Sequence, residues 1–294
     1  MSLLKHLHPD VQYKNLVRNI LKNGRIKEGR NGNVLSLFGV NMRFSLHDNK
    51  VPFLTSKKLA WKSCLKELLW FMNGSTDNKI LTEQNVKIWN ANADPIFLKS
   101  RGLNYTDGDL GRIYGHQWRY FNAEYEGCDK DYTGKGVDQL QNIVDALCDD
   151  TEKYSRRLIL SAWNPIQLNE MALPPCHVLS QFNVNKNNEL SCLLYQRSGD
   201  VGLGVPFNIA SYGMLTHIIA RHCGLKPGYL IHNLGDAHIY ENHIEPLKKQ
   251  IFRPYYSTPK IKISKKNSID DYEFKDIKIE NYQFHPTIKM DMIA

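Results

Sequence analysis

Apolar residues recur at intervals of three and four in four stretches of the chain, which is the spacing of an amphipathic α-helix. These stretches span residues 10–23, 61–72, 137–147 and 206–222. Gly24 and Gly74 follow the first two stretches, at positions where a glycine commonly ends a helix. The last stretch is strongly apolar, so we expect a central buried helix there.

Shorter apolar runs bounded by turn residues predict β-strands at residues 34–38, 42–46, 158–163, 190–195, 261–263 and 277–279. The first two runs are separated by Gly39. In the run at 261–263 lysines alternate with isoleucines, a period of two that indicates a half-buried strand with a solvated lysine face. No repeat, low-complexity tract or Pro/Ser-rich linker divides the chain, so we predict a single domain over residues 1–294.

Composition narrows the class of protein. With 294 residues, 42% of them hydrophobic, the chain is long enough to bury a sizeable core. No apolar run is long enough to span a bilayer, and the first residues lack the apolar segment of a secretion signal. We therefore expect a soluble, cytoplasmic protein. The six cysteines show no CxxC pair and no clustered Cys/His spacing, which argues against a disulfide scaffold and a structural zinc site.

The formal net charge of +8 indicates anionic partners, either nucleic acid or small phosphorylated and carboxylated ligands. Much of the excess lies in the last third of the chain, on the predicted lysine face of the strand at 261–263. A solvated face explains those lysines. The basic balance alone therefore supports no claim that nucleic acid is required.

The stretch from Met171 to Tyr212 concentrates the candidate chemistry. Cys176 follows two prolines, whose fixed φ and missing N–H groups give a stiff, non-helical approach that presents the thiol from a defined turn. Arg197 and Ser198 stand together at the end of the predicted strand, where a guanidinium and a hydroxyl suit a phosphate. The same cation would lower the pKa of a neighbouring thiol from about 8.5 towards neutrality.

A glycine-rich turn follows, with Asp200 inside it, and leads into a helix predicted to begin at Pro206 with Asn208 in its first turn. An Asn amide has both a donor and an acceptor, so it can pair with the N–H and C=O edge of an imide such as uracil. Each feature also has a common structural explanation. A cysteine is often a small buried hydrophobe, an Arg-Ser pair a solvated strand end, and a glycine-rich turn only a turn.

The segments LPPCH, SCLLYQRSGD and GLGVPFNIASY, in this order and spacing, resemble the nucleophile, phosphate-binding and pyrimidine-recognition motifs of the thymidylate synthase family. The resemblance implies an α+β fold, a single domain with a large mixed β-sheet flanked by helices, which the family shares with the dCMP hydroxymethylases. It also implies conversion of dUMP to dTMP, with 5,10-methylenetetrahydrofolate as cosubstrate and no metal. Dihydrofolate would be the second product.

The resemblance assigns roles to individual residues. Cys176 would add to C6 of uracil, Asn208 would hold the pyrimidine edge, and Tyr114 would assist removal of the C5 proton. Glu67 lies on the predicted helix at 61–72 among apolar neighbours, where a carboxyl could keep a proton near neutral pH. The expected catalytic set is Cys176, Glu67, Tyr114, His177, Asn208 and Asp200.

The two ligands are expected to share a site. The resemblance implies nucleotide contacts from Arg30, Arg156, Arg157, Gln196, Arg197, Ser198, Asp200, Asn208, His238 and Tyr240. Arg156 and Arg157 would reach the phosphate site of the other subunit of a homodimer. It implies folate contacts from Ile88, Trp89, Asn92, Asp200, Leu203, Gly204, Phe207 and Met290.

The chain departs from the family pattern at several positions, among them Asn90, Arg112, His116, Asn183 and Ala294. Two alternatives to thymidylate synthesis therefore stay open. A dUMP hydroxymethylase on the same fold would quench the intermediate with water instead of hydride. A nucleic-acid-binding protein would have kept the fold and lost the chemistry.

Overall fold

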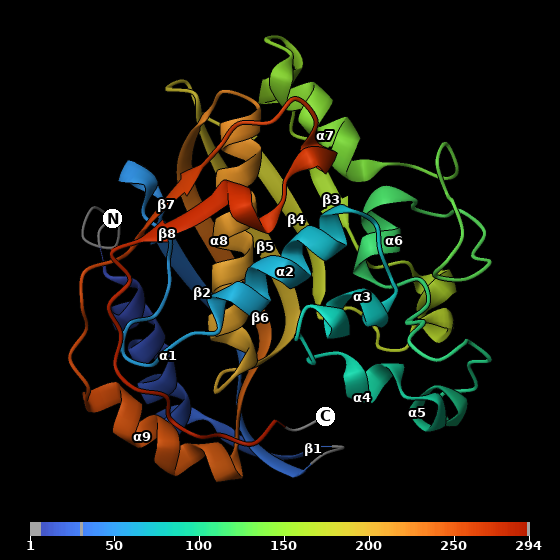
Figure 1. The fold of residues 1–294 in the computed structure, drawn as a ribbon. Helices are drawn as coiled ribbons and strands as arrows, with labels where there is room; N and C mark the ends of the chain where they lie inside the picture. The colour runs from blue at the N-terminus through green and yellow to red at the C-terminus, as the bar shows by residue number, and fades with distance from the viewer. Residues whose placement is uncertain (1–6, 30–31, 293–294) are drawn as a thin grey trace.

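A large mixed sheet forms the centre of the molecule (Figure 1). The computed structural model describes residues 7–29 and 32–292. Within these residues the main sheet has six strands in the order β1-β2-β6-β5-β4-β3. Their bounds are β1 Arg25–Gly29, β2 Gly32–Ser45, β3 Ile159–Ser161, β4 His177–Val184, β5 Glu189–Asp200 and β6 Lys226–Tyr240. β5 and β6 are parallel and the other neighbours antiparallel, which confirms the predicted mixed sheet.

The central helix is α8, Gly204–His222, which crosses one face of the sheet (Figure 1). It packs on β5 and β6 and is covered on its other side by α2, Trp61–Met72. Alternate residues of β5, such as Leu190, Cys192 and Leu194, are fully buried on the helix side. Because α8 is enclosed by sheet and helix, its sequence is apolar on almost every face, as predicted.

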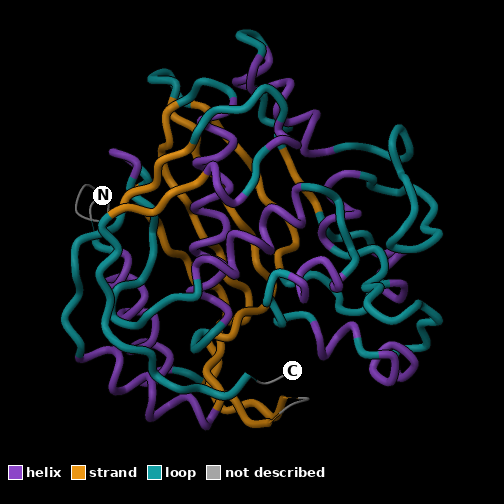
Figure 2. The backbone as a smooth tube through the Cα atoms, viewed as in Figure 1, coloured by secondary structure: helices purple, strands orange, loops and turns teal. Residues whose placement is uncertain are grey.

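The remaining elements surround this layer. α1, Pro9–Asn23, packs against α9, Ile244–Phe252, while α7, Gln139–Cys148, lies beside β3. The region between α2 and β3 consists mostly of short helices joined by loops (Figure 2): α3 Asn78–Glu83, α4 Asn90–Ala93, α5 Pro95–Ser100 and α6 Tyr114–Arg119. A second sheet pairs β7, Lys260–Ile263, with β8, Ile277–Glu280. Lys260 and Lys262 are exposed and Ile261 is buried, which confirms the predicted lysine face.

Four predicted boundaries differ from the structure. The runs on either side of Gly39 are one strand, β2, because the ladder to β6 continues on both sides of this glycine, whose φ is 82°. β5 continues through Asp200, and α8 begins at Gly204 instead of Pro206. The strand predicted at 158–163 is shorter, β3 Ile159–Ser161, and Arg156 and Arg157 lie in the turn before it.

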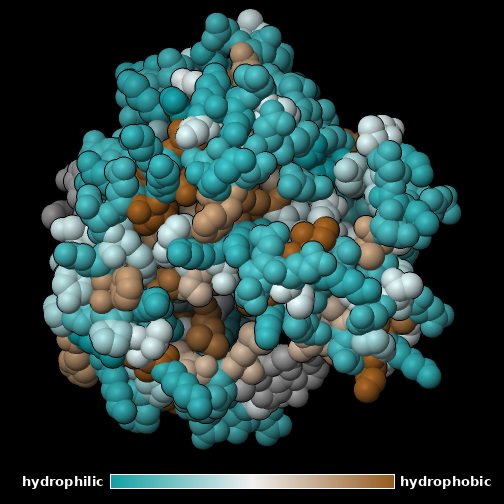
Figure 3. Space-filling view, in the orientation of Figure 1, coloured by the Kyte–Doolittle hydropathy of each residue, from teal (hydrophilic) through white to brown (hydrophobic). Residues whose placement is uncertain are grey.

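The surface reflects this arrangement. Figure 3 shows apolar residues gathered around the centre and lower centre of one face, where that face is hollowed, within a mostly hydrophilic surround. No helix in the described ranges is both long and apolar enough to cross a bilayer. The buried hydrophobic side chains form one continuous core, which includes residues from α1, α2, α8 and the main sheet.

Candidate active site

A cavity of about 560 Å³ lies where the C-terminal end of β5, the start of α8 and one side of α2 meet. The loops before α2 and β4 and the C-terminal segment complete its wall. Among its lining residues are fourteen of the predicted site residues: Glu67, Ile88, Trp89, Asn92, Tyr114, Cys176, His177, Gln196, Ser198, Asp200, Leu203, Gly204, Phe207 and Asn208. The fold therefore gathers residues that lie up to 141 positions apart, from Glu67 to Asn208, around one space.

Other predicted residues do not line this cavity, namely Arg156, Arg157, Arg197, His238, Tyr240 and Met290. Arg156 and Arg157 are exposed. His238 and Tyr240 lie two residues apart on β6 with their rings 5.3 Å apart, as expected for side chains on one face of a strand. Arg30 and Ala294 are outside the described residues.

Cys176 immediately precedes β4, at the end of a tightly bound loop. The Arg197 guanidinium donates hydrogen bonds to the carbonyl oxygens of Pro174 and Pro175, each at 3.0 Å. The backbone N–H of Arg197 donates to the carbonyl of Cys176 at 2.9 Å, and the N–H of Cys176 donates to the Tyr114 hydroxyl at 2.7 Å. These bonds hold the Cys176 backbone from two sides.

The expected low pKa of the Cys176 thiol was wrong. Burial raises the pKa of this thiol, and the opposing effect of the Arg197 charge is smaller. The direction follows from desolvation, which penalises the thiolate more than a partly engaged guanidinium stabilises it. Burial therefore favours the neutral thiol of Cys176.

Glu67 lies on α2 and is only 8% exposed. Burial raises its pKa to about 7, while the hydrogen bond from Trp89 acts in the opposite direction. In that bond the indole N–H of Trp89 donates to Glu67 Oε1 at 2.7 Å. The expectation of a carboxyl that keeps a proton near neutral pH is confirmed, because apolar walls and a single donor do not replace the water lost on burial.

Tyr114 begins α6 and presents its hydroxyl to the loop that ends at Cys176. The hydroxyl oxygen accepts the N–H groups of Cys176 at 2.7 Å and His177 at 3.3 Å. Burial raises the pKa of this phenol far above its usual value. Because two backbone donors occupy the oxygen, the hydroxyl hydrogen is left for another acceptor, such as a water molecule.

The polar floor of the cavity is a connected set of side chains. Gln196 Nε2 donates to Asn208 Oδ1 at 3.0 Å and to the carbonyl of Ser198 at 2.9 Å. The ring of His232 lies with Nε2 2.8 Å from Gln196 Oε1. Burial lowers the pKa of His177 to about 4, although a hydrogen bond with Asn208 opposes this change. Sequence reasoning missed His232, because a histidine inside an apolar strand carries no motif.

The wall of the cavity with the residues expected to contact folate combines apolar side chains with one carboxylate. Asp200 Oδ1 accepts the Gly202 N–H at 2.8 Å and lies 3.5 Å from His243 Nδ1. Lys57 was also missed by the sequence reasoning. It lines the cavity, donates to the Gly202 carbonyl at 2.8 Å, and has its pKa lowered to about 8 by burial. Met290 Sδ lies 4.0 Å from Lys57 Nζ, just behind the lining residues.

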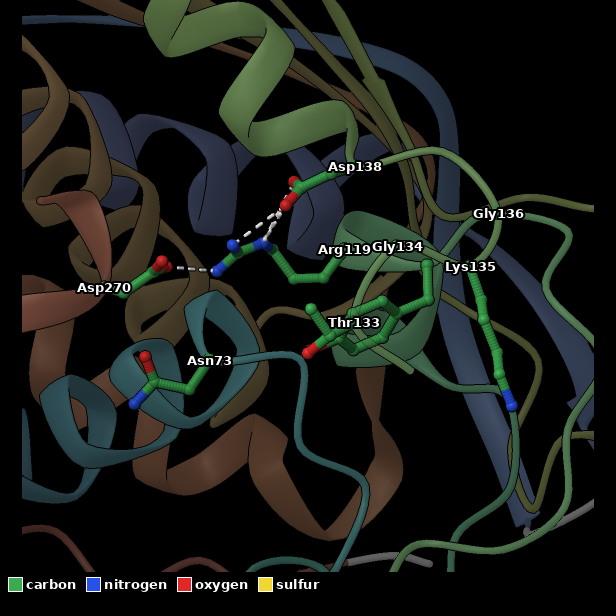
Figure 4. Close-up of a pocket in the computed structure, with 9 residues that line it drawn as sticks. Asn73, Arg119, Thr133, Gly134, Lys135, Gly136, Asp138 and Asp270 are labelled. Atoms are coloured by element: carbon green, nitrogen blue, oxygen red, sulfur yellow. Dashed lines mark hydrogen bonds and ion pairs between the residues drawn. The ribbon is translucent and has the colours of Figure 1, made fainter. Parts of the chain in front are cut away.

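A second cavity, of about 500 Å³, lies near the end of α2 (Figure 4). Arg119 points into it between two carboxylates. Its Nε lies 3.0 Å from both Asp138 oxygens, and Nη1 lies 2.5 Å from Asp270 Oδ1 and 2.6 Å from the Met72 carbonyl. Among the described residues, no group of three or more His, Cys, Asp or Glu side chains could hold a metal ion.

Comparison with known proteins identifies the family. The family model described as thymidylate synthase matches residues 11–294. The chain is 54% identical over 288 residues to thymidylate synthase of Homo sapiens, covering 97% of this chain and 91% of that protein. It is 48% identical over 291 residues to thymidylate synthase 1/2 of Encephalitozoon cuniculi, covering 98% of both.

A third relative has a longer chain. The bifunctional dihydrofolate reductase-thymidylate synthase of Leishmania major is 48% identical over 289 residues, which is 97% of this chain and 55% of that protein. The matched residues include the loop that ends at Cys176 and the polar and apolar residues that line the cavity. With a matching family model and relatives at about half identity over nearly its whole length, the chain belongs to the thymidylate synthase family.

Proposed function

We propose that the protein catalyses reductive methylation of dUMP to dTMP, with 5,10-methylenetetrahydrofolate as cosubstrate and dihydrofolate as second product. One observation carries the proposal. The thiol of Cys176, the carboxyl of Glu67, the hydroxyl of Tyr114 and the amide of Asn208 line one cavity of about 560 Å³. This set contains a nucleophile, a proton carrier and a pyrimidine-reading amide, which together meet the needs of the reaction.

Cys176 would form a covalent bond to C6 of the uracil ring. The electron pair of the C5–C6 double bond then moves towards C5 and O4, which makes C5 a carbon nucleophile. Because burial favours the neutral Cys176 thiol, its proton would pass to O4 through the Glu67 carboxyl of the same cavity as the S–C6 bond forms. The later elimination breaks this bond and returns the thiol.

Glu67 and His177 would control the charge at O4. With a pKa of about 7, the Glu67 carboxyl exists in both protonation states at neutral pH, so it can give a proton and take it back. His177, whose pKa is lowered to about 4, is neutral under the same conditions and acts through hydrogen bonding. Tyr114, with its oxygen occupied by two backbone donors, would orient the water that removes the C5 proton.

The folate would bind along the apolar wall. Ile88, Trp89, Leu203 and Phe207 line the cavity on that side and fit a flat ring system, while the Asp200 carboxylate fits its N–H donors. Asn92 and Gly204 complete the expected contacts, with Met290 behind them. The folate supplies the one-carbon unit and the hydride. The protein's residues orient it and exclude bulk water.

The phosphate and ribose sites need residues beyond the cavity of one chain. Ser198 lines the cavity, and Arg197 contacts the loop that ends at Cys176. Arg156 and Arg157 are exposed and do not line the cavity of their own chain. This placement supports a homodimer in which they complete the phosphate site of the other subunit. Tyr195, 37% exposed on the sheet face opposite α8, supports packing through that face. His238 and Tyr240 would bind the ribose, and the homodimer would be cytoplasmic.

A product assay tests this function. Purified protein is incubated with dUMP and 5,10-methylenetetrahydrofolate, dihydrofolate is followed by absorbance, and the nucleotide is identified by mass spectrometry. We expect dTMP and dihydrofolate in equal amounts. Hydroxymethyl-dUMP without folate oxidation would replace the proposal with the hydroxymethylase alternative. Absence of any product would reject both reactions.

A further inference from the structure

Two cysteines from segments far apart in the chain meet where two helices end. Cys148 is the last residue of α7, and Cys223 follows α8 as its C-cap. The Cys223 sulfur lies 3.8 Å from the carbonyl oxygen of Val144. Because Val144 precedes Cys148 by about one helical turn, the two residues lie on the same side of α7. Both helix ends lie near the top of the molecule as it is drawn in Figure 1.

The two thiols are neighbours. Burial raises the pKa of the Cys223 thiol, and so do the charge of Cys148 and a hydrogen bond between the two side chains. The charge of Lys265 acts in the opposite direction. Because a hydrogen bond requires close approach, the sulfur atoms of Cys148 and Cys223 face each other across the gap between α7 and α8.

The two thiols differ in their access to solvent. Cys148 is exposed, whereas Cys223 is half-buried. An exposed thiol meets a dissolved oxidant first, and a neighbouring thiol can then react with the oxidised sulfur. The pair therefore combines an attacking cysteine with a resolving one.

Neighbouring thiols can serve either a metal ion or redox chemistry. A structural metal site needs further ligands, and over residues 7–29 and 32–292 no three His, Cys, Asp or Glu side chains are grouped so as to hold an ion. All six cysteines of the chain are free thiols. A disulfide is the chemistry that two adjacent thiols can perform without a third ligand, and exchange with a reduced thiol reverses it.

We propose that Cys148 and Cys223 form a reversible disulfide when the protein meets a peroxide, and that this bond fastens the end of α7 to the end of α8. The Cys148 thiolate attacks one peroxide oxygen, which breaks the O–O bond, leaves a sulfenic acid on Cys148 and releases water. The Cys223 sulfur then displaces the sulfenic oxygen. The S–S bond forms, and this oxygen leaves as a second water with the Cys223 proton. The two sulfur atoms lose two electrons in total, and the two peroxide oxygens gain them.

The charges around the pair favour this order of steps. Oxidation of the Cys148 thiolate to a neutral sulfenic acid removes a negative charge beside Cys223, while Lys265 still favours the Cys223 thiolate. The second thiol therefore loses its proton more readily once the first has been oxidised. Both cysteines stand at helix ends, where the backbone moves more easily than within a helix, so the two sulfur atoms can come together.

The bond lies at the far end of α8 from the proposed chemistry. Gly204 and Asn208, in the first turns of α8, line the Cys176 cavity, and Cys223 follows the last turn. The inference therefore does not rest on the proposed function. A link between positions 148 and 223 closes a long loop, which restricts the unfolded chain and stabilises the folded one.

The test uses the full-length protein and needs no substrate. Reduced protein is treated with increasing hydrogen peroxide until Cys128 is oxidised, remaining thiols are blocked with N-ethylmaleimide, and non-reduced tryptic peptides are identified by mass spectrometry. We expect a peptide pair joined through Cys148 and Cys223 before Cys128 reacts, and dithiothreitol should separate the pair. If Cys148 and Cys223 both stay alkylated, or if Cys148 advances to a sulfinic acid instead, the proposal is wrong.

Variants assign the effect to the pair. Cys148→Ser and Cys223→Ser should each abolish the link, and Cys128→Ser should keep it. Cys128 is the matched control because it is also half-buried, but burial and nearby carboxylates such as Asp109, instead of a second thiol, raise its pKa. If Cys223→Ser fails to fold, the exposed position of Cys148 leaves Cys148→Ser as the deciding variant.

Thermal melting measures what the link does. Peroxide should raise the melting temperature of the wild type by about 5 °C, the effect of one disulfide in a chain of this size, and dithiothreitol should reverse the rise. The melting temperature of Cys148→Ser should not rise. An equal rise in Cys148→Ser would mean that another modification stabilises the protein and would overturn the proposal.

Discussion

The Cys176 cavity and the Arg119 cavity bury charge in opposite ways. Around Arg119, each charged group faces a partner: the guanidinium bonds two carboxylates and a backbone carbonyl, and these interactions raise its pKa despite burial. Around Cys176, burial disfavours the charged forms of Glu67 and Cys176 more than neighbouring groups stabilise them. Glu67 has one donor, Trp89, and its pKa rises to about 7. The Cys176 thiol also has a raised pKa.

We call the contacts of Arg119 the structural joint. They differ in this way from the proposed reactive site around Cys176. Arg119 ties the end of α2 to Asp138, which caps α7, and to Asp270 in the C-terminal part of the chain. Its charge is therefore balanced by groups of the protein itself. At the Cys176 cavity, burial disfavours the charged forms of Glu67 and Cys176 and raises the pKa of both groups. Perturbed pKa values of this origin are typical of catalytic sites.

The largest effect should come from the nucleophile. Cys176→Ala removes the sulfur that forms the covalent bond, so we expect turnover to fall below detection while dUMP binding stays measurable. Steady-state kinetics and calorimetry check this. Substantial turnover in the variant would contradict the covalent mechanism and remove the proposed difference between the Cys176 and Arg119 cavities. Cys192→Ala, which changes a buried thiol outside the cavity, is the matched control.

The next effect should come from the proton carrier. Glu67→Gln keeps an acceptor for the Trp89 indole N–H but cannot exchange a proton, so we expect kcat to fall about 10²–10⁴-fold. In the wild type, kcat should change around pH 7, near the pKa of Glu67, and the variant should lose this inflection. A variant with an unchanged pH profile would assign the inflection to another group.

A change at the structural joint should lower the free energy of unfolding and leave substrate binding unchanged. Arg119→Met keeps the apolar stem and removes the charge, leaving two carboxylates and the Met72 carbonyl without their donor. We expect a loss towards the lower end of about 3–5 kcal/mol, because both carboxylates are partly exposed. Urea unfolding measures this loss, and KM for dUMP should stay unchanged below the melting transition.

Asp270→Asn is the matched control for that joint. The side chain of Asp270 is 50% exposed, so its removal should cost only about 0.2–1 kcal/mol. A loss as large as that of Arg119→Met would mean that the C-terminal attachment, and not Asp138, holds the joint together.

The last effect is a gain in stability at the Cys176 cavity, opposite in sign to the loss expected for Arg119→Met. The folded-state pKa of Glu67 is raised from 4.5 to about 7, so folding favours its protonated form. The associated stability is fully present below pH 4.5 and is lost as pH rises through about 7. Glu67→Gln should therefore be more stable than the wild type at pH 8, by on the order of 3 kcal/mol. At pH 4.5 the two should be equal. Melting curves at both pH values check the sign of the effect. A variant that is less stable at pH 8 would contradict the explanation that burial disfavours ionised Glu67.

Sequence alone determined the elements whose pattern is local. The helical spacing at 61–72 matches α2 residue for residue, and the apolar stretch at 206–222 lies within α8. The motif residues Cys176, Ser198 and Asn208 line one cavity, as the family resemblance implied. Such features depend on periodicity and residue type, which are read directly from the chain.

Only the tertiary structure decided the rest. It joined the two strands predicted on either side of Gly39, because pairing with β6 spans the glycine. It reversed the expected pKa change at Cys176, because desolvation depends on neighbours from distant segments. It also revealed Lys57 and His232, whose positions carry no motif. Burial and hydrogen-bond partners are properties of packing, so they emerge only when segments far apart in the chain meet.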